Sequence, residues 1–122
     1  MSENNLFIME KSEAFSIRIV KMYKYLVGNQ SEAVMSKQLL RSGTSIGANI
    51  AEAQEAISVP DFISKIYISL KETSETLYWL RLLYKSDYIS ESQYQSMHND
   101  AEELKRLLTS SIKTAKMHQV QK

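Results

Sequence analysis

Apolar residues recur every three or four positions along most of the chain, which is the spacing of one face of an α-helix and not the alternation of a strand. The first stripe consists of Phe15, Ile19, Met22 and Leu26 and is followed by Gly28. A similar stripe extends from Tyr94 to Ala115, with one interruption at Ser111. The pattern predicts an all-α protein.

Helix-capping signals divide the chain into four segments. Ser58 precedes an early proline and an acidic residue, a combination that suits a first helical turn. Ser90 with Gln93 matches a capping box, and Asn29 with Glu32 is interpreted in the same way. We therefore expect helices over residues 10–27, 30–57, 59–85 and 91–117.

Short connections between long helices make each helix antiparallel to its predecessor. The expected architecture is an antiparallel up-and-down four-helix bundle, formed by residues 1–122 as a single domain. Residues 1–8 and the last few residues are expected to be disordered.

The second predicted helix contains an unusual run of small residues, RSGTSIGANIAEA, from Arg41 to Ala53. A ridge of small residues spaced by four would permit close helix packing, and it consists of Gly43, Gly47 and Ala51. The expected core face of this helix holds Leu39, Ile46, Ile50, Ala53 and Ile57. A separate polar face holds Arg41, Ser45, Asn49 and Glu52. Ser and Asn on that face are more typical of a seam against another helix than of a solvated surface.

The third predicted helix has two stripes. The expected core stripe is Phe62, Ile66, Leu70, Leu77 and Leu80, and the second stripe is Ile68, Glu72, Glu75, Trp79 and Leu83. A turn near Ser58 places residues of the two antiparallel helices at one height when their numbers sum to about 116 or 117. We therefore predict that Arg41 contacts Glu75, within the chain or across a subunit boundary. The predicted polar seam consists of Arg41, Ser45, Asn49, Glu52, Glu72, Glu75 and Trp79.

Two interpretations of this polar seam remain open. It could fix the helix register, because a paired Arg and Glu tolerate no slippage, or it could bind a ligand directly. The apolar part of the second stripe, with Trp79 in it, favours burial against another subunit. A homo-oligomer is therefore expected.

The composition adds limits on location and partners. Fifteen basic and fourteen acidic residues give a net charge of +1, and there is no Cys. No apolar run is long enough for a membrane span, so a cytoplasmic protein without membrane contact is expected. Two locally basic segments are candidate nucleic-acid contacts, and they contain Arg18, Lys21, Lys24, Lys105, Arg106, Lys113 and Lys116. A solvated outer bundle face is the alternative.

Catalytic chemistry finds little support in the sequence. Glu72 and Glu75 lack the His that a di-metal bundle site needs, and His98 with Glu102 is ordinarily a solvated pair. The run from Arg41 to Gly47 has neither the preceding strand nor the Lys of a phosphate loop. We expect no enzyme activity, no metal, no cofactor and no small-molecule substrate.

The motif R-x-x-x-S-I-x-x-N-I-A-E from Arg41 to Glu52, followed by KETSETLYWLRLL from Lys71 to Leu83, resembles the bacterial 23S rRNA intervening-sequence proteins. The resemblance spans nearly the whole chain, although Ala53 stands where Gly is more usual. It implies an up-and-down bundle assembled as a homopentameric ring. Relatives include the accessory bundle protein of diversity-generating retroelements, a nucleic-acid-binding partner of a reverse transcriptase.

Two functions from different classes follow as hypotheses. The first is a homo-oligomeric protein whose basic outer helices contact RNA or a nucleic-acid-processing protein. The alternative is a structural module that assembles with protein alone, without a nucleic-acid role.

Overall fold

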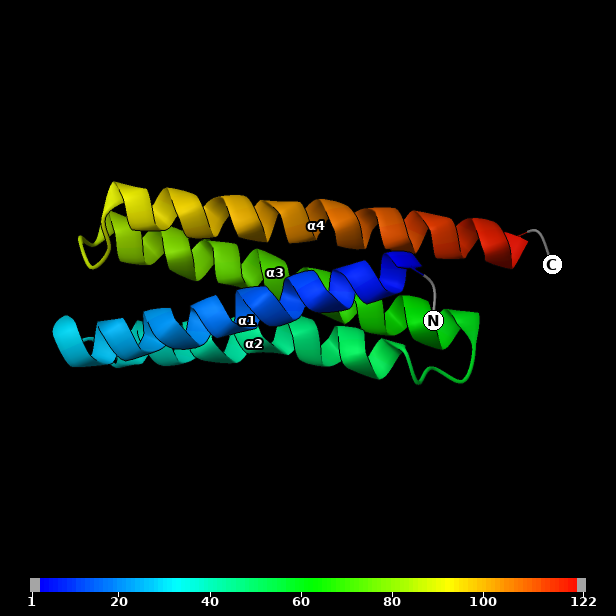
Figure 1. The fold of residues 1–122 in the computed structure, drawn as a ribbon, viewed down its shortest axis with the longest axis horizontal. Helices are drawn as coiled ribbons and strands as arrows, with labels where there is room; N and C mark the ends of the chain where they lie inside the picture. The colour runs from blue at the N-terminus through cyan, green and yellow to red at the C-terminus, as the bar shows by residue number, and fades with distance from the viewer. Residues whose placement is uncertain (1–2, 121–122) are drawn as a thin grey trace.

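The computed structural model describes residues 3–120, and within that range the chain forms four α-helices and no strand. The helices are α1 (Glu3–Asn29), α2 (Val34–Ala53), α3 (Val59–Lys85) and α4 (Glu91–Val120). Each runs antiparallel to the one before it, so the N-terminal end of α1 and the C-terminal end of α4 lie at the same end of an elongated bundle (Figure 1). The predicted all-α four-helix bundle is confirmed.

Helix α1 is longer than the sequence pattern indicated. It begins at Glu3, whereas a start near residue 10 was expected, and the prediction of disorder for residues 3–8 is wrong. Ile8 explains the extension. It lies two helical turns before Phe15 on the same apolar stripe, and its side chain is only 5% exposed because it packs in the core.

Helix α2 begins later than expected because Glu32 acts as its cap. The Glu32 carboxylate accepts hydrogen bonds from the main-chain N–H groups of Val34, Met35 and Ser36, at 3.0, 2.9 and 2.8 Å. Burial raises the pKa of Glu32, but these hydrogen bonds outweigh it and hold the pKa below its ordinary value. Asn29, the expected cap, is instead the last residue of α1.

Helix α2 also ends earlier, at Ala53 and not at residue 57. Ser58 adopts an extended conformation and accepts a hydrogen bond from the Asp61 N–H, 3.1 Å away, as the predicted cap of α3. The chain must leave the helix to reach that conformation, and Ile57 is left 94% exposed in the connection. Its expected place on the core face is therefore wrong.

One apolar core receives side chains from all four helices, among them Phe15, Ile46, Leu80 and Leu104. On α3 the core face is rotated from the expected one. Leu83 is fully buried in the core, and Phe62, Leu70 and Leu77 are only partly buried at its edge. The buried positions between Ile66 and Leu80 are instead polar, namely Ser69, Thr73 and Thr76.

Candidate functional site

Hydroxyl groups form the contact between α2 and α3. Ser69 Oγ donates to the main-chain oxygen of Ile46 across 2.6 Å, and the Thr76 hydroxyl lies 2.9 Å from that of Ser42. These side chains are fully buried, and each has a partner, so their burial leaves no polar atom unsatisfied. Ser69, Thr73 and Thr76 were not expected in the core because Ser and Thr are polar. Their spacing of four and three residues nevertheless continues the helical stripe that begins at Ile66 and ends at Leu80.

The ridge of small residues on α2 packs against α1. A methyl group added to Gly43 would lie 2.7 to 2.9 Å from side-chain atoms of Ile19, which is itself fully buried. At Gly47 the nearest atom would be Ser16 Oγ, at 3.3 Å. Of the two glycines, Gly43 therefore makes the tighter contact with α1.

The polar seam is centred on one guanidinium group. Arg41 on α2 forms ion pairs with Glu72, at 3.2 Å, and with Glu75, both on α3 of the same chain. Trp79 Nε1 also donates to Glu75 Oε2 across 3.0 Å. The hydrogen bond from Trp79 and the Arg41 guanidinium lower the pKa of the Glu75 carboxyl, and Glu75 raises the pKa of Arg41.

The other seam residues of α2 are bonded mainly to their own helix. Ser45 Oγ donates to the Arg41 carbonyl oxygen at 2.6 Å, and Asn49 Nδ2 donates to the Ser45 carbonyl oxygen at 2.8 Å. Glu52 lies 3.7 Å from the Lys65 ammonium on α3. Ser45, placed level with Glu72 by the predicted register, makes no hydrogen bond to it.

Apolar side chains remain accessible beside this seam. Ile68 on α3 is 38% exposed, Val34 on α2 is 78% exposed, and Trp79 is partly buried. On α3, Ile68, Glu75 and Trp79 lie within about 40° of arc, on the side of the helix away from Ile66, and Trp79 borders the core through Leu83 one turn later. We call the surface formed by Val34, Arg41, Ile68, Glu75 and Trp79 the seam face.

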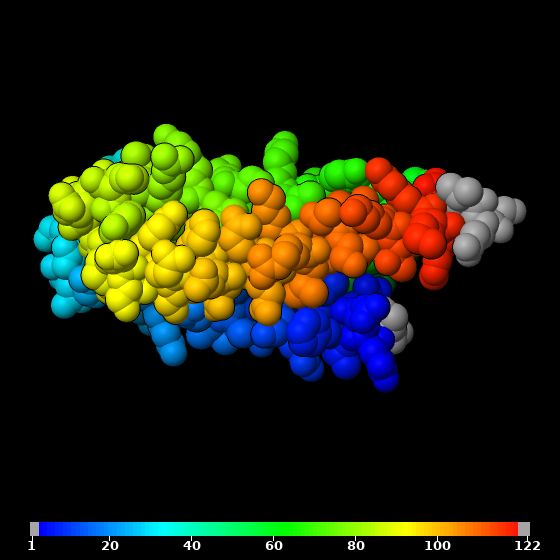
Figure 2. Space-filling view, turned by 90° about the horizontal axis from the view of Figure 1, so that it is seen from above, coloured from blue at the N-terminus to red at the C-terminus, as the bar shows by residue number. Residues whose placement is uncertain are grey.

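The basic residues of α1 and α4 do not form one surface. Arg18 on α1 is paired with Asp100 on α4 at 2.5 Å and donates to Ser96 Oγ at 2.8 Å. Because α1 and α4 are antiparallel, this pairing places Lys24 beside the start of α4 and Lys113 about 30 Å further along the bundle. Figure 2 shows the opposite directions of the two helices, with α1 and α4 side by side.

Helices α3 and α4 pack side by side, and Lys116 of α4 reaches Tyr67 of α3. The exposed basic residues of these two helices form no ion pair within residues 3–120. On α4 they are Lys105, Arg106, Lys113 and Lys116, and on α3 they are Lys71, Arg81 and Lys85. We call this surface the α3/α4 face.

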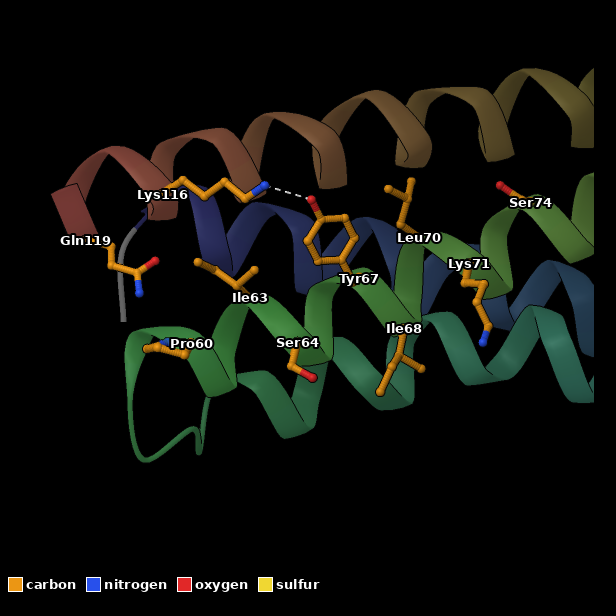
Figure 3. Close-up of a pocket in the computed structure, with 10 residues that line it drawn as sticks. All are labelled: Pro60, Ile63, Ser64, Tyr67, Ile68, Leu70, Lys71, Ser74, Lys116 and Gln119. Atoms are coloured by element: carbon orange, nitrogen blue, oxygen red, sulfur yellow. Dashed lines mark hydrogen bonds between the residues drawn. The ribbon is translucent and has the colours of Figure 1, made fainter.

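An open groove lies at one end of the α3/α4 face, and Tyr67 stands in it (Figure 3). Lys116 reaches the groove from α4, donates to the Tyr67 hydroxyl at 2.9 Å and lies 5.3 Å from the centre of its ring. Pro60, Ile63 and Leu70 supply apolar surface around it.

Groups that could hold a metal are dispersed. Glu72 and Glu75 are turned toward Arg41, and His98 lies between Glu102, at 3.9 Å, and the Tyr94 hydroxyl, at 3.4 Å. Among residues 3–120, no three His, Asp or Glu side chains gather as metal ligands would. In the same range, no helix combines the length and apolarity needed to cross a membrane.

The model of the 23S rRNA-intervening sequence protein family matches residues 4–110. The chain belongs to this family. A crystal structure of a protein of unknown function from the S23 ribosomal protein family of Bacteroides thetaiotaomicron is 55% identical, with a TM-score of 0.89. The match covers 90% of this chain and 98% of that one. No protein with a curated description matches. The resemblance drawn from the motif in α2 and α3 is thereby confirmed at the level of family and fold.

Proposed function

We propose that this member of the 23S rRNA-intervening sequence protein family is a non-enzymatic cytoplasmic scaffold that assembles with itself through the seam face. The observation that carries the proposal is the second apolar surface of α3. Ile66 and Leu80 turn other sides of this helix into the core, and Leu83 is buried one turn after Trp79, yet Ile68 stays 38% exposed and Trp79 is only partly buried. A helix in an isolated bundle requires only one apolar face.

The polar part of the seam face supports assembly more than ligand capture. Arg41 is held by two carboxylates of its own chain, and Glu75 also accepts the indole N–H of Trp79. These bonds link α2 to α3 and restrain the side chains of Arg41, Glu75 and Trp79. Side chains that are already restrained lose little conformational entropy when another subunit covers them. The homopentameric ring implied by the family resemblance is the assembly that we propose.

Light scattering on the purified full chain tests the assembly. A pentamer has five times the 14.0 kDa mass of one chain. Ile68→Glu should dissociate it, because an unpaired carboxylate in an interface is costly. Ile17→Glu is the matched control, since Ile17 is 50% exposed on α1, away from the seam face. A wild-type monomer, or equal masses for both variants and the wild type, would contradict assembly through this face.

A second function, contact with nucleic acid, is supported by the unpaired cations of α4. After Glu103, the described part of α4 holds Lys105, Arg106, Lys113 and Lys116 and no acidic residue. Phosphate contacts of this kind make affinity fall steeply as salt rises. We expect wild-type binding to a structured RNA to weaken with salt, and absent or salt-independent binding would reject the proposal. A partner protein that survives nuclease treatment in a pull-down would favour the alternative, an assembly module with protein partners only.

A further inference from the structure

We propose that the α3/α4 face binds single-stranded nucleic acid, with bases stacked on Tyr67 and Tyr78 and phosphates held by the surrounding lysines and arginines. This inference rests on the proposed nucleic-acid function. It differs from the sequence-based expectation by moving the contact away from α1 and onto α3.

The charge of this face suits a polyanion. Seven exposed cations lie along it, and none of them forms an ion pair within the described residues. Glu102 of α4, one turn before Arg106, lies 3.9 Å from His98, and Glu75, whose carboxylate also feels the charge of Lys71, is tied to Arg41. The positive charge is therefore free to contact phosphate, in contrast to that of Arg18 and Lys11, which are paired with Asp100 and Glu103.

Two aromatic rings on the same face provide stacking surfaces. Tyr67 and Tyr78 are 44% and 56% exposed. They are three helical turns apart on α3, a separation of about 16 Å along one side of the helix. Lys71 lies between them on that side, and Lys105 of α4 lies near the height of Tyr78. Aromatic rings alternating with cations are the arrangement with which proteins bind unpaired strands.

The groove around Tyr67 is suited to a base. The hydrogen bond from Lys116 fixes the ring position, and apolar atoms of Ile63 and Leu70 lie beside it (Figure 3). A duplex hides its base faces, so it would gain only the phosphate contacts here. A single strand can expose its bases to the rings, and for this reason we infer that an unpaired strand is the partner.

Fluorescence anisotropy with oligo(U) and oligo(dT) tests the inference on the full chain. Lys105→Gln/Arg106→Gln should reduce the salt slope of log affinity by about 1.4, because two phosphate contacts are lost. The matched control, Lys21→Gln/Lys24→Gln, removes the same charge from α1 and should leave affinity and slope unchanged. Tyr67→Ala should weaken binding about fivefold or more, whereas Tyr67→Phe keeps the stacking ring and should bind like the wild type.

The outcomes separate the inference from the function on which it rests. If the wild type binds neither oligonucleotide nor structured RNA, the nucleic-acid function itself is rejected. If the wild type binds but the α1 variant loses more affinity than the α4 variant, or a duplex competes equally well, only this site is rejected. Binding of anionic phosphatidylserine vesicles in place of oligonucleotides, with loss in the α4 variant, would assign the face to a membrane surface and overturn the inference. Thermal melting confirms that each exposed substitution leaves the bundle folded.

Discussion

Ser69 on α3 donates its hydroxyl hydrogen to the main-chain oxygen of Ile46 on α2, at 2.6 Å and entirely out of contact with solvent. That oxygen belongs to the backbone of a helix, so the bond joins a side chain to a position that no substitution on α2 can remove. The bond restrains both the distance and the register between the two helices, and the ion pairs of Arg41 lie about 7.5 Å from it along α2.

Ser69→Ala should destabilise the protein by about 1 kcal/mol, since one buried hydrogen bond is lost and the smaller residue leaves little void. Urea unfolding monitored by circular dichroism measures the change. Thr109→Ala provides the control, because Thr109 is exposed and its hydroxyl bonds only to Lys105 of its own helix. A loss of equal size in both variants would show that the cross-helix bond contributes nothing specific.

Gly43→Ala should destabilise the bundle by about 1 to 3 kcal/mol. The new methyl group would lie 2.7 Å from the side chain of Ile19, and that side chain is fully buried, so it cannot turn out into solvent. Gly28→Ala is the matched control because a methyl group there meets nothing within 4 Å. It should be neutral or stabilising by up to about 1 kcal/mol, since Ala favours a helix. Similar melting temperatures for the two variants would contradict the close packing of α2 on α1.

The fluorescence of Trp79, the one tryptophan in the sequence, should report protonation of Glu75. The folded pKa of this carboxyl is lowered, so its stabilising bonds are complete above the ordinary value of 4.5 and are lost as the pH falls through the lower, folded pKa. We expect a fluorescence midpoint below 4.5 for the wild type. Arg41→Ala should move it upward because the guanidinium no longer favours the charged form. Identical midpoints would show that Arg41 does not act on Glu75 in solution.

Glu32→Ala should cost about 1 kcal/mol of stability, as expected for the loss of a helix cap. Three N–H groups at the start of α2 lose their acceptor in this variant. Because the pKa of Glu32 is lowered in the folded protein, its contribution to folding stability is complete at neutral pH and is lost in strong acid. Glu55→Ala, at an exposed position just after α2, serves as the control. The stability difference between the two variants should therefore shrink on acidification, and a constant difference would contradict the capping role.

The spacing of apolar residues in the sequence was enough to predict those features of the fold that depend only on helix geometry. The antiparallel register that brought Arg41 level with Glu75 follows from the helical rise and the position of one turn, and both residues meet in the structure. Helix ends were harder to predict, because Ser31 takes a positive φ of 54° and the Glu32 carboxylate accepts hydrogen bonds from N–H groups two to four residues further along the chain. Neither feature can be recognised from the spacing of hydrophobic residues in the sequence.

The α3 core face was misjudged for a different reason. Ser69, Thr73 and Thr76 are polar as free side chains, but each hydroxyl is hydrogen bonded to a helix backbone oxygen and can then be buried. Leu70 and Leu77 are displaced to the edge as a result. The linear sequence also groups basic residues by helix, as it does Lys21 with Lys24 on α1, and it does not show which exposed cations of different helices face the same side of the bundle.

The outer side chains of α2 direct their donors inward. Thr44, Ser45, Asn49 and Gln54 each give a hydrogen to the carbonyl one turn earlier. These four side chains therefore each use one hydrogen on the chain itself before any partner arrives. Along this stretch a partner meets fewer free donors than the Ser, Thr, Asn and Gln composition suggests, so the shape of the surface contributes more to its recognition.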